Sequence, residues 1–103
     1  MNTVVYGIQE IREANKVAGQ HYFDKDTMRF FRSRVAKVTH SGPGGIFFVT
    51  SEQFDATSPR LFTVRSFDTA TGHCDTAPGC EFQEYKTGDG AHRRAKKLAE
   101  AIG

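Results

Sequence analysis

The chain is poor in cysteine, with only Cys74 and Cys80 among its 103 residues. Small secreted proteins that depend on disulfides carry a denser set of cysteines, so a disulfide framework is not expected and a reducing cytoplasm is. A single bridge between Cys74 and Cys80 is sterically conceivable, and two ordinary free thiols are the alternative.

Long hydrophobic runs are also missing from the sequence. A membrane-spanning helix needs about eighteen apolar residues in succession, and no stretch comes near that length. The chain does not open with the charged and then apolar segment that is typical of a secretory leader. We therefore expect neither a membrane span nor export.

A large net charge is absent as well, because 14 basic and 12 acidic side chains leave a net charge of only +2. Attraction to nucleic acid would have to come from local clusters of cations and not from the field of the whole molecule.

Signatures of catalysis and metal binding are lacking. The glycine-rich stretch at 42–45 has no following Lys-Ser/Thr and lies between two predicted strands, so it is typical of a hairpin and not of a phosphate loop. No serine lies in a nucleophile elbow. The histidines fall in different elements, and the two cysteines have no fourth ligand at a zinc-like spacing. We expect no catalytic, cofactor-binding or metal-binding residues, and therefore not an enzyme.

Several acidic residues are interpreted as helix caps and solvated loop residues, because each lies near a predicted helix start or in a polar loop. They are Asp24, Asp26, Glu52, Asp55, Glu81 and Glu84.

Aromatic residues are plentiful, with nine Phe and three Tyr but no Trp. Rings in this number suit a sheet that is covered by helices. The length predicts a single domain over residues 1–103.

Two helices are predicted near the start of the chain. Apolar residues recur at helical spacing from Ile8 to Ala18, and Gly19 follows where a left-handed cap would end the helix. A second, short helix is predicted up to Arg32, with Asp24 or Asp26 as the acceptor for its free amides.

Period-two patterns of β-forming residues predict the sheet. Strands are expected at 35–39, at 46–50 and at 61–67, with a shorter strand around 73–76 and a Ser-Gly-Pro-Gly-Gly turn at 41–45. The strand at 46–50 is apolar on both sides and should be central. In the strand at 61–67, Phe62 and Val64 are expected to point inward, and Thr63 and Arg65 outward.

A final amphipathic helix is predicted from Asp89, which we expect to be its cap. The fold class is therefore α+β: an antiparallel three- to four-stranded meander packed against N-terminal helices and a C-terminal helix, in the order α-α-β-β-β-(β)-α. The helices are expected to cover one side of the sheet.

Two clusters of cations are candidate binding surfaces. Cations in the first half of the last helix lie at the positive end of its dipole, where they cost stability. They either form an ordinary solvated face or contact phosphates or an acidic protein surface. Arginines in the segment 22–35 lie beside Phe30 and Phe31, which are either core rings or part of an interface. With Arg65, the candidate partner-binding residues are Arg29, Arg32, Arg34, Arg65, Arg93, Arg94, Lys96 and Lys97.

The segment 86–97, with its Thr-Gly turn and its basic, alanine-rich helix start, resembles the last helix of double-stranded-RNA-binding domains. It is also similar to the arm-type DNA-binding domains of phage integrases. Both resemblances imply direct binding of nucleic acid.

A broader resemblance covers most of the chain. The runs at 11–16, 26–35, 48–54, 63–65 and 82–83 are similar to a family of small uncharacterised proteins of phages and mobile elements. This resemblance implies an accessory protein in the cytoplasm of a bacterial host and carries no chemistry with it.

Taken together, these features predict a non-catalytic accessory protein that binds a host protein or a protein–nucleic-acid complex, as an anti-defence, anti-CRISPR-like inhibitor would. Direct binding of DNA or RNA through the C-terminal helix and the sheet is the alternative.

Overall fold

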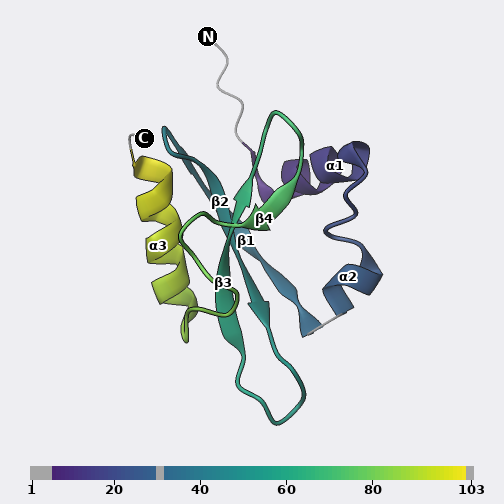
Figure 1. Cartoon of the computed structure of the whole chain (residues 1–103), viewed down its shortest axis with the longest axis vertical. Coiled ribbons are helices and arrows are strands. Elements are labelled where there is room, and N and C mark those ends of the chain that lie inside the picture. Colours follow the sequence, from purple (N-terminus) through teal and green to yellow (C-terminus); the bar gives the residue numbers. More distant parts are fainter. Residues whose placement is uncertain (1–5, 30–31, 102–103) are drawn as a thin grey trace.

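The structure is a computed structural model that describes residues 6–29 and 32–101, apart from the side chain of Asp26. Within these residues, three helices and four strands follow one another (Figure 1). Their bounds are α1 (Ile8–Ala18), α2 (Lys25–Arg29), β1 (Arg34–Gly42), β2 (Gly45–Glu52), β3 (Leu61–Phe67), β4 (Cys74–Thr76) and α3 (Gly88–Glu100).

The strands form one antiparallel sheet in the order β1-β2-β3-β4. Each strand pairs with its neighbour in sequence, which is the meander that the alternating pattern predicts. The α+β class and the order of elements are thereby confirmed, and the predicted bounds of β3 agree with the structure.

Helices cover both faces of the sheet, whereas we expected them on one. Alternating β2 residues divide between two cores, with Phe47 and Val49 against α3 and Phe48 against α1. Figure 1 shows α3 on one side of the sheet and α1 and α2 on the other. The central position of β2 is confirmed, because its side chains from Phe47 onward are buried on either face. Because the second face is also covered, the polar β3 residues that we expected to point outward do not face solvent. Thr63 is completely buried.

Helix α1 follows its predicted apolar stripe closely. Ile11 is fully buried in the core against Phe48, and Ile8 and Ala14 pack around it. Gly19 ends the helix in the left-handed conformation, with φ of 80°, as expected.

The predicted second helix is present as α2, described over Lys25–Arg29, and the continuation of the prediction at 30–31 lies outside the described residues. Asp24 occupies the expected N-cap position, because its carbonyl accepts the first helical hydrogen bond, from the Met28 amide over 2.9 Å. Its side chain accepts from the adjacent Lys25 amide over 3.0 Å. Tyr22 and Phe23 pack on Phe48, with ring centroids 6.5 and 5.9 Å from it. The interpretations of Asp26, Phe30 and Phe31 concern positions outside the described residues and side chains.

The hairpin between β1 and β2 is tighter than predicted, because both strands extend into the glycine-rich stretch and only Pro43 and Gly44 form the turn. The tip of this hairpin lies against the C-terminal end of α3, where the Gly44 amide donates to the Ala99 carbonyl over 2.9 Å. This contact fixes α3 relative to β1.

The N-cap of α3 is Thr87, whereas we had expected Asp89. The Thr87 hydroxyl accepts a hydrogen bond from the Gly90 amide over 3.1 Å, while Asp89 lies in the first turn of the helix. Both residue types cap well, but the extended backbone that an N-cap adopts is found at Thr87, with φ of −127° and ψ of 149°.

Thr87→Ala is expected to lower the free energy of unfolding by about 1 kcal/mol, the usual cost of a lost helix cap. Urea unfolding followed by circular dichroism measures it. Asp89→Asn serves as the comparison and should cost less, since it removes only a favourable charge near the helix dipole. A larger loss for Asp89→Asn than for Thr87→Ala would contradict the assignment of the cap.

Both cysteines are free thiols in the structure. Cys74 is buried between α1 and the sheet, and burial raises its pKa to about 12, so the thiol stays neutral and packs as a small apolar side chain.

Candidate functional site

A groove between β1 and the first half of α3 collects exposed cations from two distant parts of the chain. His40 of β1 and Asp89, His92, Arg93 and Lys96 of α3 line a cavity of about 380 Å³. A second cavity of about 200 Å³ lies beside it, with Arg34, Phe62 and His92 in its wall. We define the basic groove as Arg34, His40, Asp89, His92, Arg93 and Lys96.

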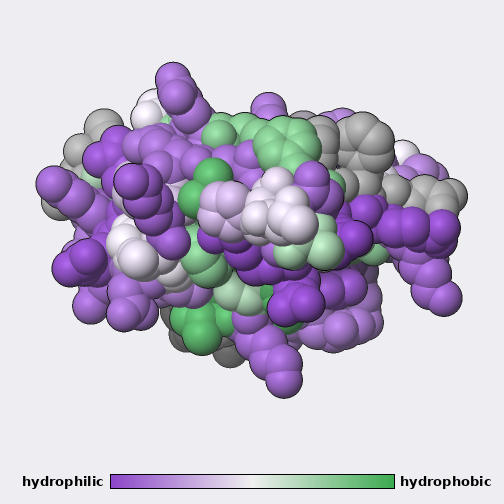
Figure 2. Space-filling model, turned by 90° about the horizontal axis from the view of Figure 1, so that it is seen from below, coloured by the Kyte–Doolittle hydropathy of each residue, from purple (hydrophilic) through white to green (hydrophobic). Residues whose placement is uncertain are grey.

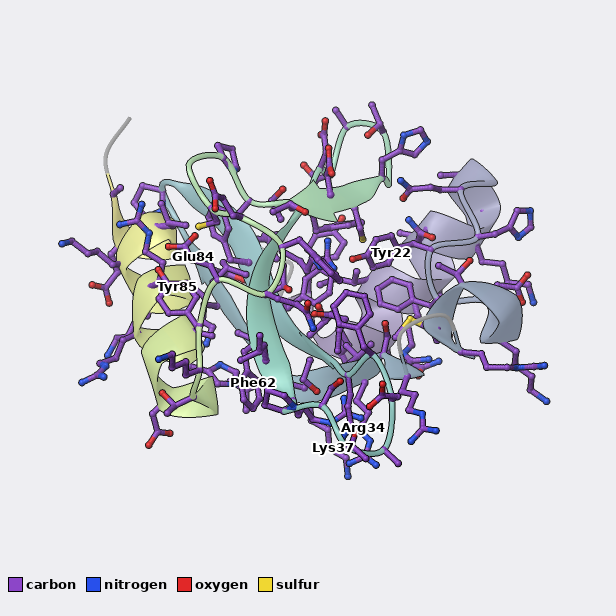
Figure 3. All side chains as sticks on the ribbon, turned by 60° about the horizontal axis from the view of Figure 1, so that its bottom comes forward. Tyr22, Arg34, Lys37, Phe62, Glu84 and Tyr85 are labelled. Carbon is purple, nitrogen blue, oxygen red and sulfur yellow. The ribbon has the colours of Figure 1, made fainter. Side chains whose placement is uncertain are left out.

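The two cavities adjoin, because His92 lines both of them. Arg34 and Lys37 project from the same end of the sheet, with Phe62 on the side toward α3 (Figure 3). Arg34, Arg93 and Lys96 are all exposed, and Asp89 is the one carboxylate that lines these cavities within the described part of the chain. The arrangement therefore favours an anionic ligand.

His40 and His92 join the two walls of the groove. The His40 Nε2 and His92 Nδ1 atoms lie 3.0 Å apart, so one ring donates and the other accepts. The pKa of His40 is lowered from its ordinary value by partial burial, and further by His92 and Lys96. His40 is therefore biased toward its neutral form.

The lowered pKa of His40 predicts that the protein loses stability when the pH falls below 6.5, the ordinary histidine value. As the pH falls, the unfolded chain takes up this proton at a higher pH than the folded protein does. Proton uptake therefore stabilises the unfolded state relative to the folded one. Thermal unfolding between pH of about 7.5 and about 5 measures this loss. In His40→Gln, stability should depend less steeply on pH over this range. A dependence as steep as that of wild type would contradict the role of His40.

A separate acidic transition is expected from Asp55, whose pKa is lowered to about 2 by hydrogen bonds from Thr57 and Ser58. Because this carboxylate titrates below its ordinary 3.8, its effect does not overlap with that of His40.

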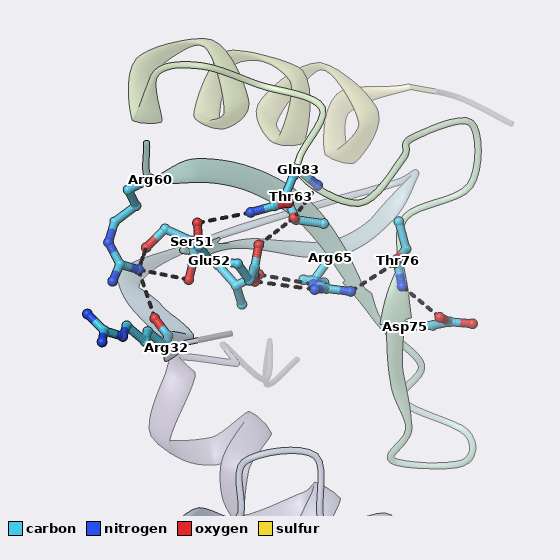
Figure 4. A network of polar contacts seen from close by, with 10 residues as sticks. Arg32, Ser51, Glu52, Arg60, Thr63, Arg65, Asp75, Thr76 and Gln83 are labelled. Carbon is cyan, nitrogen blue, oxygen red and sulfur yellow. Dashed lines mark hydrogen bonds and ion pairs between the residues drawn. The ribbon is translucent and has the colours of Figure 1, made fainter. Parts of the chain in front are cut away.

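Arg60, which the sequence patterns did not identify, holds the beginning of β1 beside the end of β2. The Arg60 Nη1 donates to the Arg32 carbonyl over 3.0 Å and to the carbonyl and hydroxyl of Ser51 over 3.1 and 3.0 Å (Figure 4). Its pKa is lowered by partial burial and by the nearby Arg34. Arg60 follows Pro59 in a polar loop, and no periodicity marks it.

A second polar cluster lies on the opposite face of the sheet, around Glu52. Its carboxylate accepts from the Thr50 hydroxyl over 2.6 Å and the Thr63 hydroxyl over 2.7 Å, and it forms an ion pair with Arg65 over 3.3 Å (Figure 4). The Glu52 side chain is 1% exposed and that of Arg65 is 12% exposed. The outward orientation predicted for Arg65 and the loop solvation predicted for Glu52 are both wrong.

Arg65 is further enclosed by its neighbours. Its Nε donates to the Thr50 hydroxyl over 3.0 Å and its Nη1 to the Thr76 hydroxyl over 2.8 Å. The rings of Tyr22 and Phe82 each lie 5.7 Å from the guanidinium carbon. These contacts satisfy the buried charges, and we interpret the cluster as a structural element of the core.

A family model matches residues 7–96 of the chain. The protein belongs to DUF7447, a family of unknown function. This confirms the resemblance to an uncharacterised family, because all the runs on which it rested lie inside the matched residues. Neither curated proteins nor solved structures gave a match to the chain.

The remaining predicted cations lie outside the groove of this DUF7447 protein. Arg94 turns toward the loop before α3, where a hydrogen bond to the Cys80 thiol raises its pKa. Lys97 is exposed on α3, Arg32 is exposed beside the loop of Arg60, and Arg29 lies in α2. Of the eight predicted residues, the structure thus brings together Arg34, Arg93 and Lys96.

Among the described residues, no group of three or more His, Cys, Asp or Glu side chains is placed to hold a metal ion. None of the described helices has the length and apolar character to cross a membrane. Seen from the end that carries the β2–β3 loop, the surface is mostly hydrophilic, with smaller hydrophobic areas between polar side chains (Figure 2).

Proposed function

We propose that this protein is a small non-catalytic accessory protein of a phage or mobile element. It binds a nucleic-acid-handling complex of its bacterial host and blocks a surface of that complex, as an anti-defence inhibitor does. The observation that carries the proposal is the basic groove, in which exposed cations of β1 and α3 converge.

The charge balance of the groove supports binding and not turnover. Arg34, Arg93 and Lys96 face a single carboxylate, Asp89, so the groove attracts anionic surfaces and speeds their association. The resemblance of the chain to small proteins of phages and mobile elements supports the biological setting.

Affinity capture from a lysate of the host tests the proposal. The tagged wild type is compared with Arg93→Glu/Lys96→Glu, which reverses two exposed charges in the groove. Arg12→Glu/Lys16→Glu is the matched control, since it makes the same change in charge on α1. We expect the groove variant to recover at least about tenfold less partner than wild type, and the control to recover as much as wild type. Equal recovery by all three proteins would contradict the proposal.

Direct binding of nucleic acid is the second candidate, and the row of cations along the groove favours it. Phosphate contacts by Arg34, Arg93 and Lys96 would give a slope of about −3 in a plot of log affinity against log salt. Capture that survives nuclease treatment of the lysate points to a protein partner, and capture that is lost points to nucleic acid.

A further inference from the structure

The histidine pair lies where a bound anion would act on it. His40 and His92 share one hydrogen bond over 3.0 Å inside the cavity that Arg93 and Lys96 also line. In a neutral pair each ring carries one N–H, and one of these protons lies between the two facing nitrogens. A further proton would place a positive charge among existing cations.

The charged groups around the pair come from two elements. Helix α3 contributes Asp89, Arg93 and Lys96, and β1 contributes Arg34 through the adjoining cavity. The side chains that β2 and β3 direct toward α3 cannot change this balance near neutral pH, because they are not ionisable: Phe47, Val49, Ser51, Phe62 and Val64. Three cations against one carboxylate oppose a further positive charge on the His40 ring.

A phosphate in the groove would reverse this balance. Its negative charge would offset Arg93 and Lys96, and its oxygens would accept a hydrogen bond from a protonated ring. The pKa of a histidine rises when an anion lies next to it, so binding and proton uptake strengthen each other.

We infer that the basic groove binds the backbone phosphates of a nucleic acid and that the His40–His92 pair takes up one proton from solvent on binding. The inference rests on the second candidate function, direct binding of nucleic acid, with the groove as its site. His92 lies between the cavity that holds Arg34 and the cavity that holds Lys96, so successive cations follow the groove on both sides of the pair. Such a row suits a polymer with regularly spaced charges better than a single free anion.

The sign of the expected pH dependence follows from this linkage. Affinity should rise as the pH falls through the range of the pair, by no more than about tenfold per pH unit for one proton. Ordinary phosphodiesters stay ionised over that range, so only the protein changes its charge.

The test measures the affinity for a fluorescent DNA duplex of about 16 base pairs, at about 50 mM salt. Wild type should bind about three to ten times more tightly at a pH of about 5.5 than at about 7.5. His40→Gln/His92→Gln should bind the duplex with nearly the same affinity at both pH values. His21→Gln/His73→Gln, which alters two exposed histidines away from the groove, should keep the wild-type response.

Imidazole resonances followed by NMR give a second readout on the wild type itself. We expect the pKa of His40 or His92 to rise when the duplex is added, and no rise would overturn the inference even if the variants unfold. Poly-glutamate that displaces the duplex at equal charge would overturn the assignment to phosphate.

The same experiment separates the two ways of failing. A flat pH profile with binding that still depends on Arg93 and Lys96 would overturn proton uptake alone. Binding that Arg93→Glu/Lys96→Glu leaves unchanged would instead overturn the groove as the binding site.

Discussion

Replacing Glu52 with Ala is expected to lower the free energy of unfolding by about 3–5 kcal/mol. The change removes the partner of Arg65, whose side chain is only 12% exposed, and leaves a buried charge with no counter-ion. It also removes the acceptor of the Thr50 and Thr63 hydroxyls. Because a small domain is stable by about 5–15 kcal/mol, this loss is a large fraction of the total.

Urea unfolding at neutral pH measures the change, and Glu81→Gln is the matched control at an exposed carboxylate. The control should stay within about 0.5 kcal/mol of wild type. If Glu52→Ala does not fold, a cycle of Glu52→Gln, Arg65→Met and the double variant still measures the coupling. We expect a coupling energy of about 1–3 kcal/mol, and additive effects would show that the pair is not an interacting unit.

The second large effect is expected for Gly44→Ala at the tip of the β1–β2 hairpin. A Cβ atom there would lie 2.0 Å from the Leu98 carbonyl oxygen and 2.8 Å from that of Ala101. Backbone atoms cannot move aside as a flexible side chain can, so the end of α3 and the hairpin must separate. The hydrogen bond from the Gly44 amide to Ala99 is then weakened as well.

We expect Gly44→Ala to cost about 2–4 kcal/mol, the sum of overpacking and a strained hydrogen bond. Thermal and urea unfolding measure it. Gly19→Ala is the comparison, because that position has a φ of 80° but no atom within 4 Å of the added Cβ. It should cost only about 1 kcal/mol of backbone strain. A smaller loss for Gly44→Ala than for Gly19→Ala would contradict the close packing of hairpin and helix.

The elements of the fold could be predicted from local patterns because each rests on neighbouring residues. Alternating β-formers gave the bounds of β3, and the apolar stripe with Gly19 gave α1 and its end. The covered second face could not be predicted in this way. An alternating strand fixes which residues share a face, and it does not show whether a helix from elsewhere covers that face.

The wrong orientation predicted for Arg65 has the same cause. The environment of Arg65 in the structure depends on the register between β2 and β3. Thr50 lies opposite Thr63, which brings polar side chains of β2 and β3 together under α1 and α2. Glu52 at the end of β2 then has hydroxyl donors on both strands. A pattern read along one strand does not contain this cross-strand arrangement.

The basic groove was predicted only in part for a similar reason. Cations of the last helix and of the segment around Arg34 were both identified as candidate surfaces, but nothing local joined them. Their meeting depends on tertiary packing of α3 on the sheet, through its buried alanines and the Gly44 contact with Ala99. His40 and Arg60 were missed because single residues of these types carry no periodic signal.

Mapping the bound ligand on the isotope-labelled protein by NMR tests the central claim most directly, namely that the groove between β1 and α3 is the binding face. When the duplex or a captured partner is added, we expect the largest changes in amide chemical shift around His40, His92 and Lys96. Changes concentrated on α1, around Arg12 and Lys16, with the groove unaffected, would contradict the account.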